Sequence, residues 1–200
     1  MTSAKLRLTG EKPAFGDTPP PRPPNHFLTL TVEMGKLAPI EMSTESPAPD
    51  LIPYQKCNFH TLLPADYRYT SGHFWLSCQA NGVWRVGLTK FALRMLGEMV
   101  DHNFQALPGA RVELGQVIGS IECFKAMSDL YCVVQGEFVG VNEALRDQGK
   151  LLTTQPYAAG WLYEVRGDPD PRATDVAGYQ QHLDQVIEQL RAQYGGEDEG

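Results

Sequence analysis

Residues 117–134 read Val-Ile-Gly-Ser-Ile-Glu-Cys-Phe-Lys-Ala-Met-Ser-Asp-Leu-Tyr-Cys-Val-Val, and this stretch carries most of the information about the fold. Two β-forming runs, 117–124 and 126–134, flank Lys125 and predict a β-hairpin with the lysine at its tip. An amine at such a tip is open to a modifying enzyme, and an amide formed on it would extend as a long, swinging arm into solvent. From the hairpin pattern alone, an ordinary solvated lysine in a turn is the favoured interpretation.

The segment 57–166 consists of short β-forming runs that glycines interrupt. Strands are predicted at 75–79, 83–88, 99–106, 117–124, 126–134, 137–141 and 160–165. Asn81-Gly82 predicts a hairpin turn between the first two strands, and Gln135-Gly136 predicts a later turn. Thr89 is placed to cap a short helix at 89–96. Many short strands joined by glycine turns are typical of a barrel or sandwich, so we expect a mainly-β fold.

A single apolar stripe near the C-terminus predicts an amphipathic helix at 174–193. Its members recur at three- and four-residue steps: Val176, Tyr179, Leu183, Val186, Ile187 and Leu190. Such a stripe more often docks a helix on its own domain than on a partner. Gly195-Gly196 ends the helix, and residues 195–200 form an acidic tail.

Prolines dominate the first part of the chain, at positions 19–21, 23, 24, 39, 47, 49 and 53. Proline removes amide donors and forces extended backbone, so we expect residues 1–56 to be a largely disordered extension. A short strand at Phe27–Val32 is a possible exception. The folded domain with its C-terminal helix is then expected at 57–194.

Composition excludes several classes of function. The chain has 200 residues, a net charge of −7 and a sequence pI near 5.2, which argues against a nucleic-acid partner. It has no apolar run long enough to cross a membrane, no secretory signal, and no catalytic nucleophile motif, P-loop or dinucleotide turn. Its four cysteines form no CxxC pair, which points to a reducing cytoplasm. Cys57 and His60 are too few ligands for a zinc site.

Residues from about 62 to 190 resemble the glycine cleavage H-protein family. The resemblance is carried, in order, by Leu63-Pro64, Tyr69-Thr70, His73, Trp75, Gly87-Leu88-Thr89, Leu96-Gly97, Leu107-Pro108-Gly109, Glu122, Lys125, Ala126, Ser128, Asp129, Gly136-Glu137, Val141-Asn142, Pro156-Tyr157 and Gly160-Trp161-Leu162. It implies a barrel-sandwich hybrid of the lipoyl/biotinyl type with peripheral helices, and lipoate attached covalently to Lys125. Supporting roles fall to Glu122, Asp129, His73, Gly109 and Gly136.

The same resemblance implies a non-catalytic carrier that shuttles an aminomethyl group and reducing equivalents. Its partners would be a pyridoxal-phosphate glycine decarboxylase, a folate-dependent aminomethyltransferase, a flavin dihydrolipoyl dehydrogenase and a lipoylating enzyme. Biotin is disfavoured because biotin carriers place methionine on both sides of the lysine, whereas Phe124 and Ala126 stand here. Two alternatives stay open: an H-like lipoyl carrier of another pathway, such as sulfur oxidation, and an unlipoylated interaction module.

Four departures from the family pattern carry expectations. Phe74 and Lys90 stand where the family has Glu and Asp, and Ala106 replaces an acidic residue. Loss of a charge-assisted contact at position 74 is expected to weaken retention of a cationic arm by roughly ten- to a hundredfold, so Phe74→Glu should prolong it. Cys123 replaces serine on the predicted face of Lys125, where it would exchange with a dithiolane, although a packing role is favoured for both Cys123 and Cys132.

Overall fold

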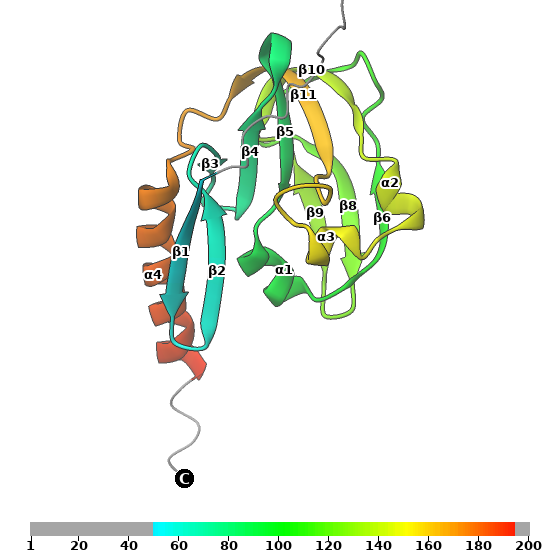
Figure 1. Cartoon of the computed structure of the whole chain (residues 1–200). Coiled ribbons are helices and arrows are strands. Elements are labelled where there is room, and N and C mark those ends of the chain that lie inside the picture. Colours follow the sequence, from blue (N-terminus) through cyan, green and yellow to red (C-terminus); the bar gives the residue numbers. More distant parts are fainter. Residues whose placement is uncertain (1–49, 195–200) are drawn as a thin grey trace, which may run out of the picture. The chain divides into compact units, whose positions relative to one another are not determined.

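The computed structural model of this chain describes residues 50–194 (Figure 1). The strands are β1 (Leu51–Lys56), β2 (Phe59–Pro64), β3 (Arg68–Tyr69), β4 (Phe74–Cys78), β5 (Val83–Leu88), β6 (Met99–Phe104), β7 (Arg111–Val112), β8 (Val117–Cys123), β9 (Met127–Tyr131), β10 (Val134–Val141) and β11 (Tyr163–Pro169). The helices are η1 (Ala80–Gly82), α1 (Lys90–Leu96), α2 (Ala144–Asp147), α3 (Leu151–Thr154) and α4 (Val176–Tyr194). None of these helices is both long and apolar enough to span a bilayer.

Two antiparallel sheets enclose the main core. One has six strands in the order β3-β4-β5-β11-β10-β7, and the other has three in the order β6-β8-β9. Strands of both sheets contribute fully buried side chains to one cluster, among them Leu76, Val86, Ile118, Ile121, Leu130, Phe138 and Val165. The helices lie at the periphery of these sheets, so the mainly-β prediction with peripheral helices is confirmed. Within residues 50–194 the sheets do not close into a continuous barrel.

The local turn and cap signals act as predicted. Asn81 and Gly82 both have left-handed φ angles, 60° and 69°, and they join β4 to β5. The side chain of Thr89 accepts a hydrogen bond of 3.4 Å from the backbone N–H of Ala92 and so caps α1. Gly97, with a φ of 85°, ends the same helix.

The ordered domain begins earlier than composition indicated. Residues 51–56, assigned above to the disordered extension, form β1, which pairs with β2 from Leu51↔Pro64 to Lys56↔Phe59. The Tyr54 hydroxyl donates to Asp184 of α4 at 2.9 Å, and Lys56 reaches Glu188 at 2.6 Å. Proline at position 53 is compatible with β1 because this strand pairs on one edge only. Residues 1–49, including the strand considered at 27–32, and the tail 195–200 lie outside the described residues.

Removal of β1 should therefore destabilise the domain. A chain that begins at Asn58 is expected to unfold with a free energy roughly 2–4 kcal/mol lower than one that begins at Asp50, because it lacks the buried side chain of Tyr54 and its hydrogen bond to α4. Urea denaturation of both truncated chains measures the difference. Equal unfolding midpoints would show that β1 contributes no stability and that the predicted boundary at position 57 was adequate.

The C-terminal helix docks on its own domain, as predicted. Asp175 caps α4, since its carboxylate accepts from the N–H of Gly178 at 2.9 Å. Tyr179 is buried and stacks on Tyr69 with 4.7 Å between the ring centroids. It belongs to a second cluster, aromatic in character, that α4 forms with β1–β4 and α1: Tyr54, Phe59, Leu63, Tyr69, Trp75, Phe91, Tyr179, Leu183 and Ile187. The predicted bounds of 174–193 differ from those of α4 by two residues or fewer.

One predicted turn is wrong. Gly136 lies inside β10, opposite Gly167 of β11, with a φ of 149°. A Cβ at Gly136 would collide with the carbonyl oxygen of Arg166, so glycine is needed here for close approach of two strands rather than for a turn. Gly109 does lie in a turn, with a φ of 84° and its N–H bonded to Phe138 at 2.8 Å. The short helices α2 and α3 had no counterpart in the prediction.

Candidate functional site

Lys125 lies at the tip of the hairpin that β8 and β9 form. The ladder between these strands ends at the pair Glu122↔Met127, and the N–H of Cys123 closes the turn on the carbonyl of Ala126 at 2.9 Å. The lysine side chain is exposed. In Figure 1 the lower end of the β8–β9 hairpin lies beside α1. The hairpin and its terminal lysine are therefore as the sequence predicts.

The C-terminal end of α1 holds the backbone of the tip in place. The N–H of Phe124 donates to the carbonyl of Glu98 at 2.9 Å, and the N–H of Lys125 donates to that of Leu96 at 3.0 Å. The ammonium of Lys125 in turn donates to the carbonyl of Arg94 at 3.2 Å. These bonds require close approach, and Gly97 permits it, because a Cβ there would lie 3.2 Å from Cγ of Lys125. The loop backbone is fixed while the amine stays accessible.

Helix α1 is itself positioned from the other side of the domain. The hydroxyl of Thr89 lies 2.8 Å from that of Tyr179 in α4, and its N–H donates to the carbonyl of His73 at 2.9 Å. Phe91 and Leu93 anchor the helix in the aromatic cluster and in the main core, respectively. A continuous set of contacts thus runs from α4 through α1 to the hairpin. Sequence reasoning identified the cap at Thr89 but not the role of α1 as the seat of the tip.

Glu122 and Asp129 lie on either strand of the hairpin, and both are exposed. Within residues 50–194 neither carboxylate forms a salt bridge. Two large apolar side chains flank them, Phe124 at 75% exposure and Met127 at 71%. The tip therefore presents both apolar surface and unpaired carboxylates to a partner.

His73 has a structural position, away from the tip. Its Nδ1 lies 3.0 Å from the hydroxyl of Tyr179, and its ring packs against Phe91 with centroids 4.7 Å apart. Burial, with a smaller contribution from the neighbouring His182, lowers the pKa of His73 to about 4, so the ring is neutral near pH 7. Its left-handed φ of 62° is a further sign that packing holds it. Of the predicted supporting residues, the hairpin brings only Glu122 and Asp129 near Lys125 in the fold.

Phe74 lies in the interior. Its side chain is 6% exposed and belongs to the main core, where β4 pairs it with Leu88 of β5. The N–H of Phe74 donates to the hydroxyl of Thr70 at 3.2 Å, which fixes the start of the strand. The expectation that a glutamate at position 74 would reach a charged arm is therefore wrong for this fold, since the side chain points into the protein.

The cysteines near the hairpin pack in the interior. Cys123 and Cys132 are both buried, and burial raises the pKa of each thiol. The thiol of Cys132 also approaches the carbonyl of Val134 at 2.9 Å. This confirms the packing role and removes Cys123 as an exchange partner for a dithiolane. Cys57 and Cys78 are free and exposed, and no three His, Cys, Asp or Glu side chains gather into a metal-binding group anywhere in the described part of the chain.

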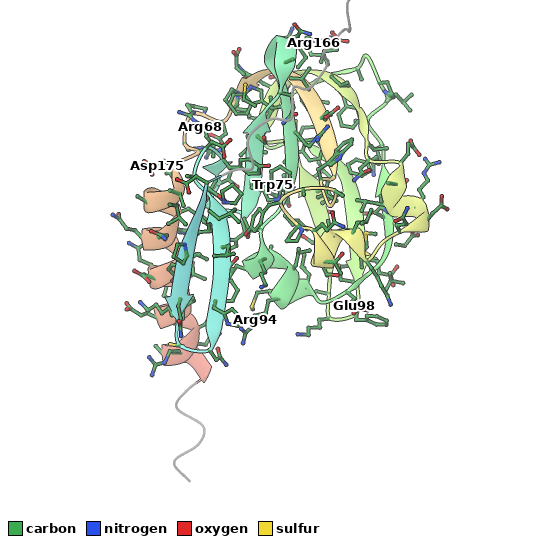
Figure 2. All side chains as sticks on the ribbon, in the orientation of Figure 1. Arg68, Trp75, Arg94, Glu98, Arg166 and Asp175 are labelled. Atoms are coloured by element: carbon green, nitrogen blue, oxygen red, sulfur yellow. The ribbon has the colours of Figure 1, made fainter. Side chains whose placement is uncertain are left out.

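Arg94 and Glu98 both contact the tip of the hairpin through their backbone carbonyls. Figure 2 labels Arg94, at the end of α1, and Glu98, next to the hairpin. In the sequence, only the end of α1 is indicated, by the glycine of Leu96-Gly97 that follows an amphipathic run. What the site can do chemically follows from its one exposed amine: it can form an amide with a carboxylic acid and display the acyl group beyond the surface.

Comparisons with known proteins agree with this geometry. Residues 67–188 match the family model described as glycine cleavage H-protein. The glycine cleavage system H protein of Corynebacterium jeikeium is 40% identical over 125 residues, which is 60% of this chain and 96% of that protein. The H protein of Pseudoalteromonas atlantica is 37% identical over 128 residues, 62% of this chain and 97% of that protein.

A solved structure extends the likeness to three dimensions. The crystal structure of a glycine cleavage system H protein from Mycobacterium marinum matches with a TM-score of 0.56 and 31% identity. The match covers 61% of this chain and 99% of the other. This likeness supports the prediction of a barrel-sandwich hybrid with a peripheral C-terminal helix. The chain therefore belongs to the glycine cleavage H-protein family.

Proposed function

We propose that this protein is a lipoyl carrier in which lipoate forms an amide with Lys125. The observation that carries the proposal is the exposed Lys125 amine on a turn whose backbone α1 holds by hydrogen bonds at 2.9 and 3.0 Å. When attached, lipoate supplies a dithiolane that is reversibly reduced and that carries a covalent cargo. The chain contributes no catalytic group to this chemistry. It presents the arm and keeps the root of the arm in one place.

The residues around the amine suit this task. The ammonium of Lys125 donates to the carbonyl of Arg94 at the C-terminal end of α1, and an amide N–H on the same atom is still able to donate there. Glu122 and Asp129 are proposed as recognition groups for the lipoylating enzyme, because they are exposed and close to the turn. Phe124 and Met127 provide apolar surface for partner enzymes.

The first candidate pathway is glycine cleavage, as in the family. The proposed partners are then the pyridoxal-phosphate glycine decarboxylase, the folate-dependent aminomethyltransferase, the flavin dihydrolipoyl dehydrogenase and a lipoylating enzyme. The cargo would be an aminomethyl group, which is cationic when protonated. A second candidate, a carrier for another lipoyl-dependent pathway such as sulfur oxidation, is favoured by one observation: α1 begins with Lys90, which offers no carboxylate to that cation.

Replacement of the attachment lysine tests the proposal. Lys125→Arg is expected to abolish lipoylation by a lipoate ligase and reduction of the arm by a dihydrolipoyl dehydrogenase. The free energy of unfolding should change by no more than about 0.5 kcal/mol, because the side chain is exposed. Lipoyl incorporation is read by mass and reduction by NADH absorbance, with Lys150→Arg as the matched control. Lipoate on Lys90 or Lys150 in the variant would contradict the assignment.

A further inference from the structure

A buried triangle of polar groups joins α4, the start of α1 and the residue before β4. The hydroxyl of Tyr179 lies 2.8 Å from that of Thr89 and 3.0 Å from Nδ1 of His73. The N–H of Thr89 closes the triangle by donating to the carbonyl of His73 at 2.9 Å. Tyr179 and Thr89 are 1% and 0% exposed, so their hydroxyls depend on each other and on His73 rather than on bulk water.

The direction of these hydrogen bonds follows from the cap of α1. Oγ1 of Thr89 already accepts from the N–H of Ala92, so its own proton is free to donate to Tyr179. The hydroxyl of Tyr179 then donates to Nδ1 of His73, whose neutral ring carries its proton on Nε2. The reverse direction would leave the Thr89 proton without an acceptor among residues 50–194. Tyr179 is thus the group through which α4 holds the cap.

Helix α1 is short enough for its cap to affect its far end. It has seven residues, and an isolated helix of that length is unstable in water. One line of backbone hydrogen bonds spans it, because the N–H of Leu93 donates to Thr89 at 3.1 Å and that of Gly97 donates to Leu93 at 2.9 Å. The buried side chains of Phe91 and Leu93 keep the helix on the domain. Loss of a contact at Thr89 should therefore loosen α1 locally without detaching it.

The far end of α1 is the part to which the attachment turn is bonded. The N–H of Lys125 donates to the carbonyl of Leu96, the last residue of the helix, and the N–H of Phe124 donates to that of Glu98. Exchange of these two amide protons with solvent requires the turn to separate from α1. Their exchange rates therefore report how firmly the turn is held.

From these contacts we infer that Tyr179 is a positioning residue for the attachment lysine. Its hydroxyl holds Thr89, Thr89 caps α1, and α1 holds the turn around Lys125. The inference rests on the proposed lipoylation of Lys125 and adds a condition to it. Docking of α4 through Tyr179 keeps the turn in the form that the lipoylating enzyme binds.

Hydrogen exchange of the full, unmodified chain tests the inference. Tyr179→Phe removes the hydroxyl but keeps the ring, which stacks on Tyr69 with 4.7 Å between the centroids. Loss of one buried hydrogen bond should raise the exchange rates of the Phe124 and Lys125 amides by roughly three- to tenfold. NMR measures these rates residue by residue, so local opening of the turn is separated from unfolding of the whole domain.

Tyr69→Phe is the matched control. Tyr69 is buried in the same aromatic cluster, and its hydroxyl donates to the carbonyl of Pro64 at 2.8 Å instead of to α1. Its loss should lower the stability of the domain to a similar degree and leave the exchange of the two tip amides unchanged.

Substitutions of Thr89 test the same link from its other side. Thr89→Ser keeps the hydroxyl and should retain the tip exchange of the wild type, whereas Thr89→Val should accelerate it. The addition of Tyr179→Phe to Thr89→Val should have little further effect, because both variants remove the same hydrogen bond.

The kinetics of lipoylation give a second readout. With a lipoate ligase, lipoate and ATP, the KM for the unmodified chain should rise at least about twofold in Tyr179→Phe, because the enzyme binds only the ordered turn. The kcat should stay the same, since the bound enzyme holds the turn itself. Tyr69→Phe should leave both constants unchanged.

Equal tip exchange in Tyr179→Phe and the wild type would overturn the inference. An equal acceleration in Tyr69→Phe, or an unchanged KM in Tyr179→Phe, would overturn it too. Absence of lipoylation in the wild type would overturn the proposed function. The exchange rates come from the unmodified chain, so they would still decide whether Tyr179 holds the turn.

Discussion

Phe74→Glu is expected to lower the free energy of unfolding by at least about 3 kcal/mol. Phe74 is 6% exposed and lies in the main core, so its replacement removes buried apolar contacts. The substitution also buries a carboxylate among apolar side chains. The variant should unfold at much lower urea concentration than the wild type. Failure to accumulate folded protein at all would be the extreme form of the same result.

A conservative substitution separates loss of volume from burial of charge. Phe74→Leu keeps an apolar side chain and should cost only about 1 kcal/mol. If Phe74→Glu instead stayed within 1 kcal/mol of the wild type, position 74 would be open to solvent. The expectation that a glutamate there holds a cationic arm would then be restored, against the packing described above.

Stability should also fall on acidification because of His73. Burial lowers its folded pKa to about 4, whereas the unfolded chain takes up a proton near 6.5. The unfolded state therefore binds the proton first as the pH falls. The contribution of His73 is complete above about pH 6.5 and is lost progressively toward pH 4, where the loss amounts to about 3 kcal/mol.

The contribution of His73 is isolated by comparison with His73→Asn. Asparagine tolerates the left-handed backbone, where φ is 62°, and has no titrating ring. The variant is expected to be less stable than the wild type at pH 7, but its stability should fall less steeply between pH 6.5 and 4. Urea denaturation at a series of pH values gives both slopes, and carboxylates contribute equally to the two. Parallel curves would show that His73 titrates normally and is not buried as described.

Local signals were sufficient for the Asn81-Gly82 hairpin and for the hairpin that places Lys125 at its tip. Asn81-Gly82 predicts its turn because few residues adopt left-handed φ angles in succession, and Thr89 predicts a helix start because its hydroxyl satisfies a free N–H. The alternation around Lys125 predicts strands that end at an exposed turn. In each case the cause and the structural effect lie within a few residues of each other.

The misassigned elements have long-range causes. Gly136 resembles a turn glycine locally, but its role depends on Gly167, thirty-one positions later in a strand that packs against its own. Pro53 lowered the expectation of structure at 51–56, yet β1 is stabilised by Asp184 and Glu188 from the far end of the chain. Neither the Gly136–Gly167 pairing nor the contacts of β1 with α4 can be predicted from the residues nearby in the sequence.

The candidate site shows the same division. The place of Lys125 at an exposed hairpin tip was predictable, whereas its hydrogen bonds to α1 depend on backbone carbonyls whose positions only the fold sets. His73 belongs to the family pattern, which implied a supporting role, and the fold places it in contact with Tyr179 and Phe91.

Mass spectrometry of the protein purified from its own cells tests the central claim most directly. The intact mass should exceed the sequence mass by one lipoyl group, and peptide fragmentation should place that group on Lys125 alone. An unmodified chain from cells that lipoylate their other carriers, or a lipoyl group on any other lysine, would contradict the account.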